Sequence, residues 1–182
     1  MSGPRAKGKR ARSRAIIMHA AKGLFEEKGI SHVTFNDIAQ RADMCRTTIF
    51  NHFPTINDLF LAIMEQEVTD ILDYCEASKD EGSDLIIRLF EKLIDDAVEY
   101  PVFAIKLFAN SIINEEERKS VRQIEEIIAK NLKCDEDEKE HRITMLTGIY
   151  YGLINHGIIA EIPFDADSMK RKFNQYAKPY LD

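Results

Sequence analysis

Residues 34–53, TFNDIAQRADMCRTTIFNHF, decide the fold of this chain. Asp37 follows Thr34 by three residues, a spacing that predicts a capped helix start, because each side chain can bond the other's backbone amide. A turn is expected over residues 42–45, and a second short helix up to about His52. Two short helices joined by a four-residue turn indicate a helix-turn-helix arrangement.

Helical periodicity continues on both sides of this segment. Apolar residues three and four positions apart predict a helix from about Ser13, which Gly29 ends. Thr55 and Asp58 repeat the capping spacing and open a long helix to about Ser78. No strand alternation persists for six residues, so the predicted fold class is all-α with about nine helices. The further helices are expected over residues 83–100, 102–113, 114–132, 143–159 and 166–180, with a charged loop and the next helix start at residues 135–140.

Composition excludes several classes of protein. The 182 residues are 45% hydrophobic and 31% charged, as in ordinary globular proteins. Cys45, Cys75 and Cys134 lie far apart without metal-ligand spacing, so we expect reduced thiols and neither a disulfide framework, a metal site nor a cofactor. The longest uncharged run, Ile143–Ala160, carries polar residues and three glycines, which favours a buried helix over a membrane span. A cytoplasmic protein is therefore expected.

Charge is distributed unevenly along the chain. Residues 1–60 hold ten Lys and Arg against five Asp and Glu, a net charge of +5, and the remainder has a net charge of −11. A basic segment beside an acidic remainder indicates a polyanionic partner, and nucleic acid fits better than a membrane surface. Three parts are expected: a basic disordered tail (1–12), a helix-turn-helix domain (13–56) and a helical domain (57–182).

The second helix of such a motif lies in the major groove of DNA. Arg46 can donate two hydrogen bonds to guanine, and Thr47 can meet a base edge or a thymine methyl group. Backbone amides at the helix start near Thr34 suit a phosphate. The complete set of expected DNA-contacting residues is Thr34, Asn36, Cys45, Arg46, Thr47, Thr48, Phe50, Asn51 and His52.

Five pieces of sequence stand in a specific order: I-x-x-A-A-x-x-L-F at 17–25, Gly29, T-F-x-D-I-A at 34–39, T-I-F-x-H-F at 48–53 and D-L at 58–59. With these pieces, residues 14–61 resemble the DNA-binding domain of the TetR (tetracycline-repressor-type) family of bacterial transcriptional regulators. The resemblance implies a homodimer that binds a palindromic operator, most often as a repressor, and is released by a small-molecule effector.

Four positions depart from the family pattern: Asp43, Cys45, Phe50 and Ile56 stand where the family usually has Gly, Ser or Thr, Tyr, and Lys. Phe50 lacks a phosphate-binding hydroxyl, Ile56 removes a cation, and Asp43 would repel a phosphate that it faced. We therefore expect DNA binding to depend unusually on the basic tip, residues 5–14. Cys45 is interpreted as a weak helix cap, with an oxidisable thiol beside Arg46 as the alternative.

In the helical domain, Gly148 and Gly152 allow close approach of another helix, with apolar area from Ile149 and Leu153. These four residues are the expected dimer interface, with packing inside one chain as the alternative. Aromatic residues are the candidates for an effector pocket, although such residues often form only core. They are Phe90, Tyr100, Phe103, Phe108, Tyr150 and Tyr151, with Lys106, Asn155 and His156 as possible polar anchors.

Two other classes of function compete with a ligand-responsive regulator. An enzyme is not expected, because no phosphate-binding glycine motif, HExxH or nucleophile elbow occurs. A helical adaptor or nucleoid protein would bind DNA without sequence preference. A regulator should instead prefer its operator over random DNA by at least roughly 10³.

Overall fold

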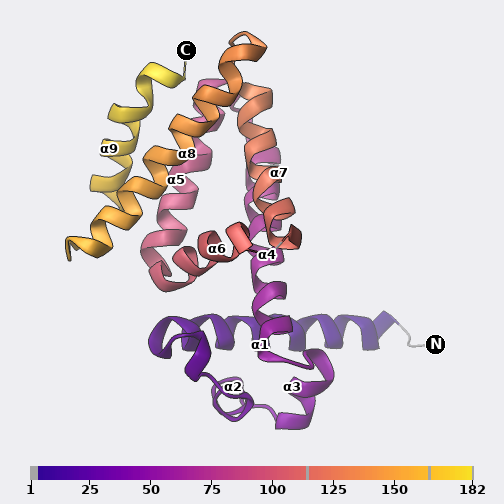
Figure 1. Cartoon of the computed structure of the whole chain (residues 1–182). Coiled ribbons are helices and arrows are strands. Elements are labelled where there is room, and N and C mark those ends of the chain that lie inside the picture. Colours follow the sequence, from indigo (N-terminus) through magenta and orange to yellow (C-terminus); the bar gives the residue numbers. More distant parts are fainter. Residues whose placement is uncertain (1–3, 114, 164, 182) are drawn as a thin grey trace. The chain divides into compact units, whose positions relative to one another are not determined.

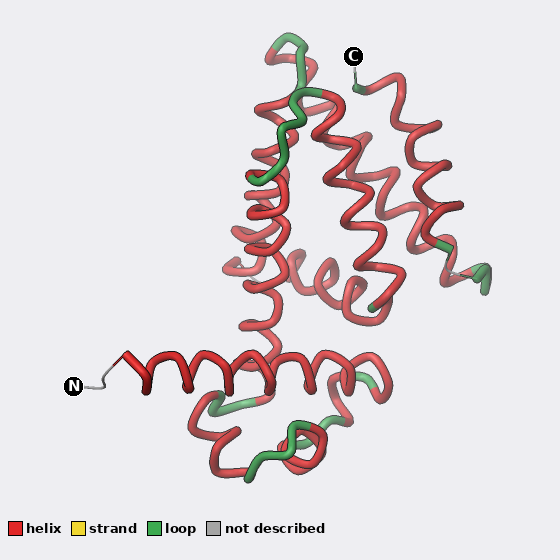
Figure 2. The backbone as a smooth tube through the Cα atoms, turned by 180° about the vertical axis from the view of Figure 1, so that it is seen from behind, coloured by secondary structure: helices red, strands yellow, loops and turns green. Residues whose placement is uncertain are grey.

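The computed structural model describes residues 4–113, 115–163 and 165–181, and every regular element among them is a helix (Figure 1). The all-α prediction is confirmed, and Figure 2 shows helices joined by short loops throughout the described chain. In chain order the elements are α1 (Pro4–Lys28), η1 (Ile30–His32), α2 (Phe35–Arg41), α3 (Arg46–His52), α4 (Ile56–Glu76), α5 (Ser83–Glu99), α6 (Pro101–Ile113), α7 (Glu115–Asn131), α8 (Glu136–Ile159), α9 (Ala166–Ala177) and η2 (Lys178–Tyr180).

The chain divides into two compact units, residues 1–66 and 67–182, so the division falls inside α4 and beyond the expected boundary at residue 57. The packing of the first turns of α4 explains the difference. Leu59 and Phe60 are buried, and the Phe60 ring meets that of Phe25 in α1 edge to face, with 6.1 Å between ring centroids. These turns therefore belong with the N-terminal helices.

The predicted capping box at the start of α2 is present. The backbone amide of Thr34 donates to Asp37 Oδ2 at 2.9 Å, and the Asp37 amide donates to Thr34 Oγ1 at 3.3 Å. Two ion pairs then join α2 to α1: Arg41 to Glu27 at 2.6 Å and Lys28 to Asp37 at 2.6 Å. The Lys28 ammonium, with Thr34, holds the pKa of Asp37 well below its usual range.

A disordered tail is expected over residues 1–12, but residues 4–12 are helical because α1 begins at Pro4, and residues 1–3 lie outside the described residues. Proline suits the first turn of a helix, where its missing N–H has no partner to lose. The following Ala, Lys and Arg residues are strong helix formers, with Gly8 as the weak position. The cations Lys9, Arg10 and Arg12 thus project from a helix.

Residues 135–140 are expected to form a charged loop and the next helix start, and the structure places the helix start early in this run, because α8 begins at Glu136. Three acidic residues fill its first turn, where negative charge is favourable beside the positive end of the helix dipole. Lys139 pairs with Glu136 at 2.8 Å and Arg142 with Glu138 at 2.9 Å, which adds support along the helix surface.

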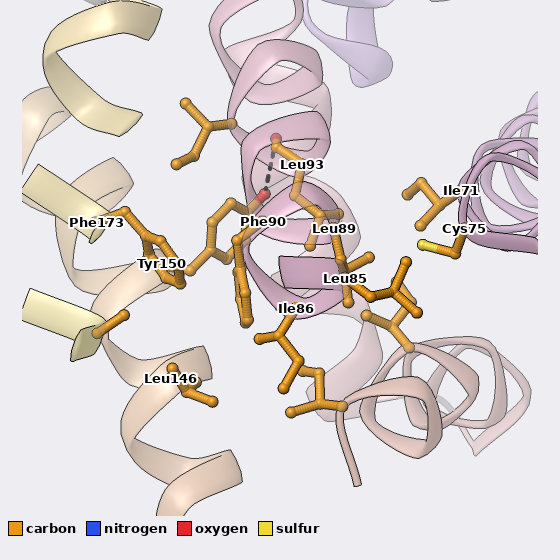
Figure 3. Packing of buried hydrophobic residues seen from close by; sticks show 14 of the residues in the cluster. Ile71, Cys75, Leu85, Ile86, Leu89, Phe90, Leu93, Leu146, Tyr150 and Phe173 are labelled. Atoms are coloured by element: carbon orange, nitrogen blue, oxygen red, sulfur yellow. Dashed lines mark hydrogen bonds between the residues drawn. The ribbon is translucent and has the colours of Figure 1, made fainter. Parts of the chain in front are cut away.

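The core of the second unit is built around α5 (Figure 3). On one side, Phe90 stacks on Phe173 of α9 with ring centroids 4.4 Å apart, and Tyr150 of α8 packs 5.9 Å from Phe90. The Tyr150 hydroxyl donates to the backbone carbonyl of Leu93 at 3.3 Å. On the other side, Leu85 and Leu89 face the α4 residues Ile71 and Cys75. Burial raises the pKa of the Cys75 thiol.

Two positions on one face of α8 are not covered by other parts of the described chain. Gly148 and Gly152 are exposed, and a Cβ atom added at either would meet no other heavy atom within 4 Å, apart from the helix backbone around it. Ile149 and Leu153 differ, since they are partly buried against the core of the second unit. The glycines therefore leave room for a second helix without being needed for the fold.

The expected dimer predicts that Gly148→Leu separates folding from assembly, because Gly148 has open surroundings and lines neither hollow of the second unit. The substitution should leave the unfolding free energy unchanged or raise it by about 0.5–1 kcal/mol, because glycine inside a helix is unfavourable. The dimer dissociation constant should rise at least about tenfold, because the added side chain keeps the partner helix away. Sedimentation equilibrium measures this constant.

Gly8→Leu is the matched control, because Gly8 is a helical glycine of the first unit with equally open surroundings. An unchanged dissociation constant for Gly148→Leu would show that this face of α8 is not the interface.

Candidate nucleic-acid interface

Helix α3 is held by two buried side chains and presents polar and aromatic groups outward. Ile49 is fully buried, and Phe53, the C-cap residue of α3, is 1% exposed. Arg46 and Thr47 are exposed at the helix start, and Phe50 is 55% exposed although it is a large apolar residue. We call Arg46, Thr47 and Phe50 the outer face of α3. Its residue types suit hydrogen bonding and stacking with a partner surface.

An aromatic contact between α2 and α3 extends the outer face of α3 onto α2. The ring of Phe50 meets that of Phe35 in α2 edge to face, with 6.2 Å between centroids. Thr34 and Asn36 lie beside Phe35 at the start of α2 and are exposed. Because the capping box occupies the Thr34 hydroxyl and the amides of Thr34 and Asp37, the amides of Phe35 and Asn36 are the groups of this helix start that could bind a phosphate.

The turn between α2 and α3 contains a residue in the left-handed backbone region. Asp43 has φ 51° and is exposed. Glycine adopts this conformation without steric cost, and aspartate tolerates it better than most residues with a side chain. The departure at this position is therefore compatible with the same turn, but it adds a negative charge to the surface.

Cys45 is the N-cap residue of α3, and no side-chain capping bond is made there. Its Sγ atom lies 2.9 Å from the Thr48 hydroxyl, and this contact, with the Thr48 amide, lowers the pKa of the Cys45 thiol. In the free protein, the side chains of Cys45 and Thr48 therefore hydrogen-bond to each other. Redox sensitivity of Cys45 stays a prediction.

The structure brings the basic N-terminal helix and the end of α3 together. Lys9, Arg10 and Ser13 of α1 line an open hollow with Asn51 and His52 of α3. Sequence reasoning assigned the two cations to a disordered tail and missed this grouping. Proline in the first turn and the helix-forming composition that follows it could have indicated the longer helix.

The surroundings of His52 disfavour its charged form. Burial, together with the positive charges of Arg10 and Arg14, lowers the pKa of His52 from the ordinary value of a histidine. Arg14 is fixed nearby, with its guanidinium 4.2 Å from the centre of the Phe53 ring and Nη1 donating to the His52 carbonyl at 3.5 Å. The imidazole is therefore mainly neutral at pH 7 and would gain a proton beside an added anion.

The effector candidates divide into two groups. Phe108, Tyr150 and Tyr151 line a hollow of about 260 Å³ between α6 and α8, with Asn155 as a polar wall residue. Phe90 joins Tyr150 and Tyr151 around a neighbouring space of about 40 Å³. Four candidates line neither hollow: Tyr100, Phe103, Lys106 and His156.

Other kinds of site find no support in the described residues. No group of three or more His, Cys, Asp or Glu side chains there is arranged to hold a metal ion. Within the same residues, no helix combines the length and apolar character needed to cross a bilayer.

Comparison with known proteins agrees with the geometry of the first unit. Residues 17–63 match the family model for bacterial regulatory proteins of the tetR family. The chain is 31% identical over 101 residues to the HTH-type transcriptional regulator TtgR of Pseudomonas putida. That match covers 51% of this chain and 48% of TtgR, so the chain spans about half the length of this curated relative.

Solved structures share the whole fold at low sequence identity. A transcriptional regulator from Aquifex aeolicus has a TM-score of 0.74 at 20% identity, covering 92% of this chain and 98% of that one. The regulator FadR from Bacillus subtilis, in complex with stearoyl-CoA, has a TM-score of 0.72 at 13% identity, covering 92% and 97%. Residues 17–63 therefore correspond to the N-terminal segment of the tetR family of bacterial regulatory proteins, and the chain as a whole shares the fold of these solved regulators.

Proposed function

We propose that this protein is a homodimeric transcriptional regulator, a repressor that leaves a palindromic operator when a small-molecule effector binds. The observation that carries the proposal is the outer face of α3, which buried Ile49 and Phe53 hold in place within the segment matching the family. Two-fold symmetry of the dimer would place one α3 on each half-site. Because the partner is genomic DNA, the protein would act in the cytoplasm.

The second unit would hold the effector in the hollow beside Tyr150 and Tyr151. A likeness to FadR, whose structure contains stearoyl-CoA, supports ligand binding by proteins of this fold. Helix α4 contributes residues to both units, so it is the segment through which a ligand could act. The ligand would shift the population of two states by binding one of them more tightly.

A non-specific DNA-binding protein is the alternative, and two residues favour it. Asp43 adds negative charge to the turn, and Phe50 offers no hydroxyl to a phosphate. Capture and sequencing of genomic fragments on the purified protein, at near-physiological salt, separates the two functions. Enrichment of one or a few palindromic sites supports the regulator. Uniform weak binding would establish the alternative.

Arg46→Ala should relax specificity at one base position of each half-site. Loss of a two-hydrogen-bond contact with guanine should weaken operator binding by about 1–3 kcal/mol, with a smaller effect on random DNA. Titrations of operators substituted at each position measure this. Equal loss on operator and random DNA would assign Arg46 to the DNA backbone.

Lys9→Gln combined with Arg10→Gln should weaken binding to all sequences alike. If each cation neutralises one phosphate, the slope of log K against log salt should become shallower by about 1.8. Lys79→Gln with Lys130→Gln removes the same charge from exposed positions of the second unit and serves as the control. An unchanged slope in the first variant would exclude the hollow beside Asn51 and His52 from the DNA contact.

DNA affinity should rise as the pH falls through the range in which His52 gains a proton. The pKa of His52 is lowered in the free protein, and a neighbouring phosphate would raise it in the complex. At a pH between the pKa of His52 in the free protein and its pKa in the complex, DNA binding is accompanied by uptake of a proton. The affinity for DNA can therefore rise by up to about tenfold for each unit that the pH falls.

Titrations between about pH 7.5 and pH 5.5 test this linkage. His52→Gln should flatten the profile relative to His32→Gln, which changes an exposed histidine of η1. Identical profiles for the two variants would contradict a role for His52.

A further inference from the structure

A carboxylate lines the aromatic space in the second unit. Glu125 of α7 lines the smaller hollow together with Tyr150 and Tyr151, and these two tyrosines also line the larger hollow. The remaining walls of the smaller hollow are aliphatic or aromatic apart from Thr147. A negatively charged group in such surroundings is costly unless a positive charge accompanies it.

No side chain among the described residues supplies that positive charge. The described walls of the two hollows contain no Lys, Arg or His. In the part of the chain that the structure describes, Glu125 makes no ion pair or side-chain hydrogen bond. The carboxylate thus lies against an apolar space with its charge uncompensated by these residues.

Several aromatic rings gather at the two hollows that Glu125 and Tyr151 line. Phe108 packs on Tyr151 with 4.0 Å between ring centroids, and Tyr150 lies 5.1 Å from Tyr151. Burial, with the charge of Glu125, raises the pKa of Tyr151 to about 12, so this phenol keeps its proton at pH 7. Aromatic faces attract cations, and the attraction grows where water is excluded.

We propose that this cavity binds a lipophilic organic cation, with an ammonium-type centre at Tyr151 and Glu125 and an apolar body in the larger hollow. Glu125 would repel an anion and would lose hydration without compensation beside a neutral ligand. The role of this cation as effector rests on the proposed function, whereas its binding can be measured on the protein alone.

Isothermal titration calorimetry on the full chain tests the ligand class with two matched probes. Benzyltrimethylammonium carries the positive charge, and 2,2-dimethylpropylbenzene has the same shape with carbon in place of nitrogen. A third probe, 4-phenylbutyrate, is an anion. The cation should bind at least about tenfold more tightly than either of the others.

Glu125→Gln should reduce affinity for the cation by about tenfold and change affinity for the neutral probe by less than about twofold. Glu126→Gln, at an exposed neighbouring position of α7, is the control and should change neither. Tyr151→Leu should weaken the cation more than the neutral probe, because it removes the aromatic face. Unchanged thermal unfolding establishes that each variant is folded.

Equal affinity for cation and neutral probe, a preference that survives Glu125→Gln, or no saturable cation binding at millimolar concentration would each overturn the proposal. Failure of the regulator function gives a different result. The cation would then bind with the same dependence on Glu125, while the protein would show no operator preference or would keep its operator in the presence of the cation.

Discussion

Helices of seven residues are marginal in water, and both α2 and α3 have this length. Their conformation depends on the burial of Ile38, Ile49 and Phe53, each 1% exposed or less. Because Ile49 and Phe53 anchor α3 in the interior of the first unit, the residues on the opposite side of α3 are not needed for packing. The outer face is therefore free to carry residues chosen for a partner. The ion pairs of Lys28 and Arg41 fix α2 on α1, and so fix the support on which α3 lies.

Local signals in the sequence were sufficient where a few neighbouring residues determine the structure. The spacing of Thr34 and Asp37 predicts a capping box because both partners lie within one turn. Runs of charge were misleading. Residues 1–12 suggest a disordered tail and residues 135–140 a charged loop before the next helix. Lys, Arg and Glu are nevertheless good helix formers, and acids at a helix start are stabilised by its dipole, so helix extends through most of both runs.

The site depended on tertiary contacts that no local pattern contains. Some forty residues separate Lys9 and Arg10 from Asn51 and His52, and their grouping needs the folded unit. Tyr150 and Tyr151 were expected as pocket residues from their aromatic character. Glu125 was not, because one acid among several on an amphipathic helix looks solvated until its neighbours are known.

The open surroundings of Gly148 and Gly152 have a consequence for the evolution of such proteins. Because the fold of one chain makes no use of the space beside Gly148, and Gly148 lines neither hollow, natural selection would act on substitutions there only through their effect on assembly. Gene duplicates in one cell could then lose mutual pairing by changing side-chain size on this face, and each copy would still fold. Independence of paralogous regulators could arise from one or two such changes, long before their cores or operators diverge.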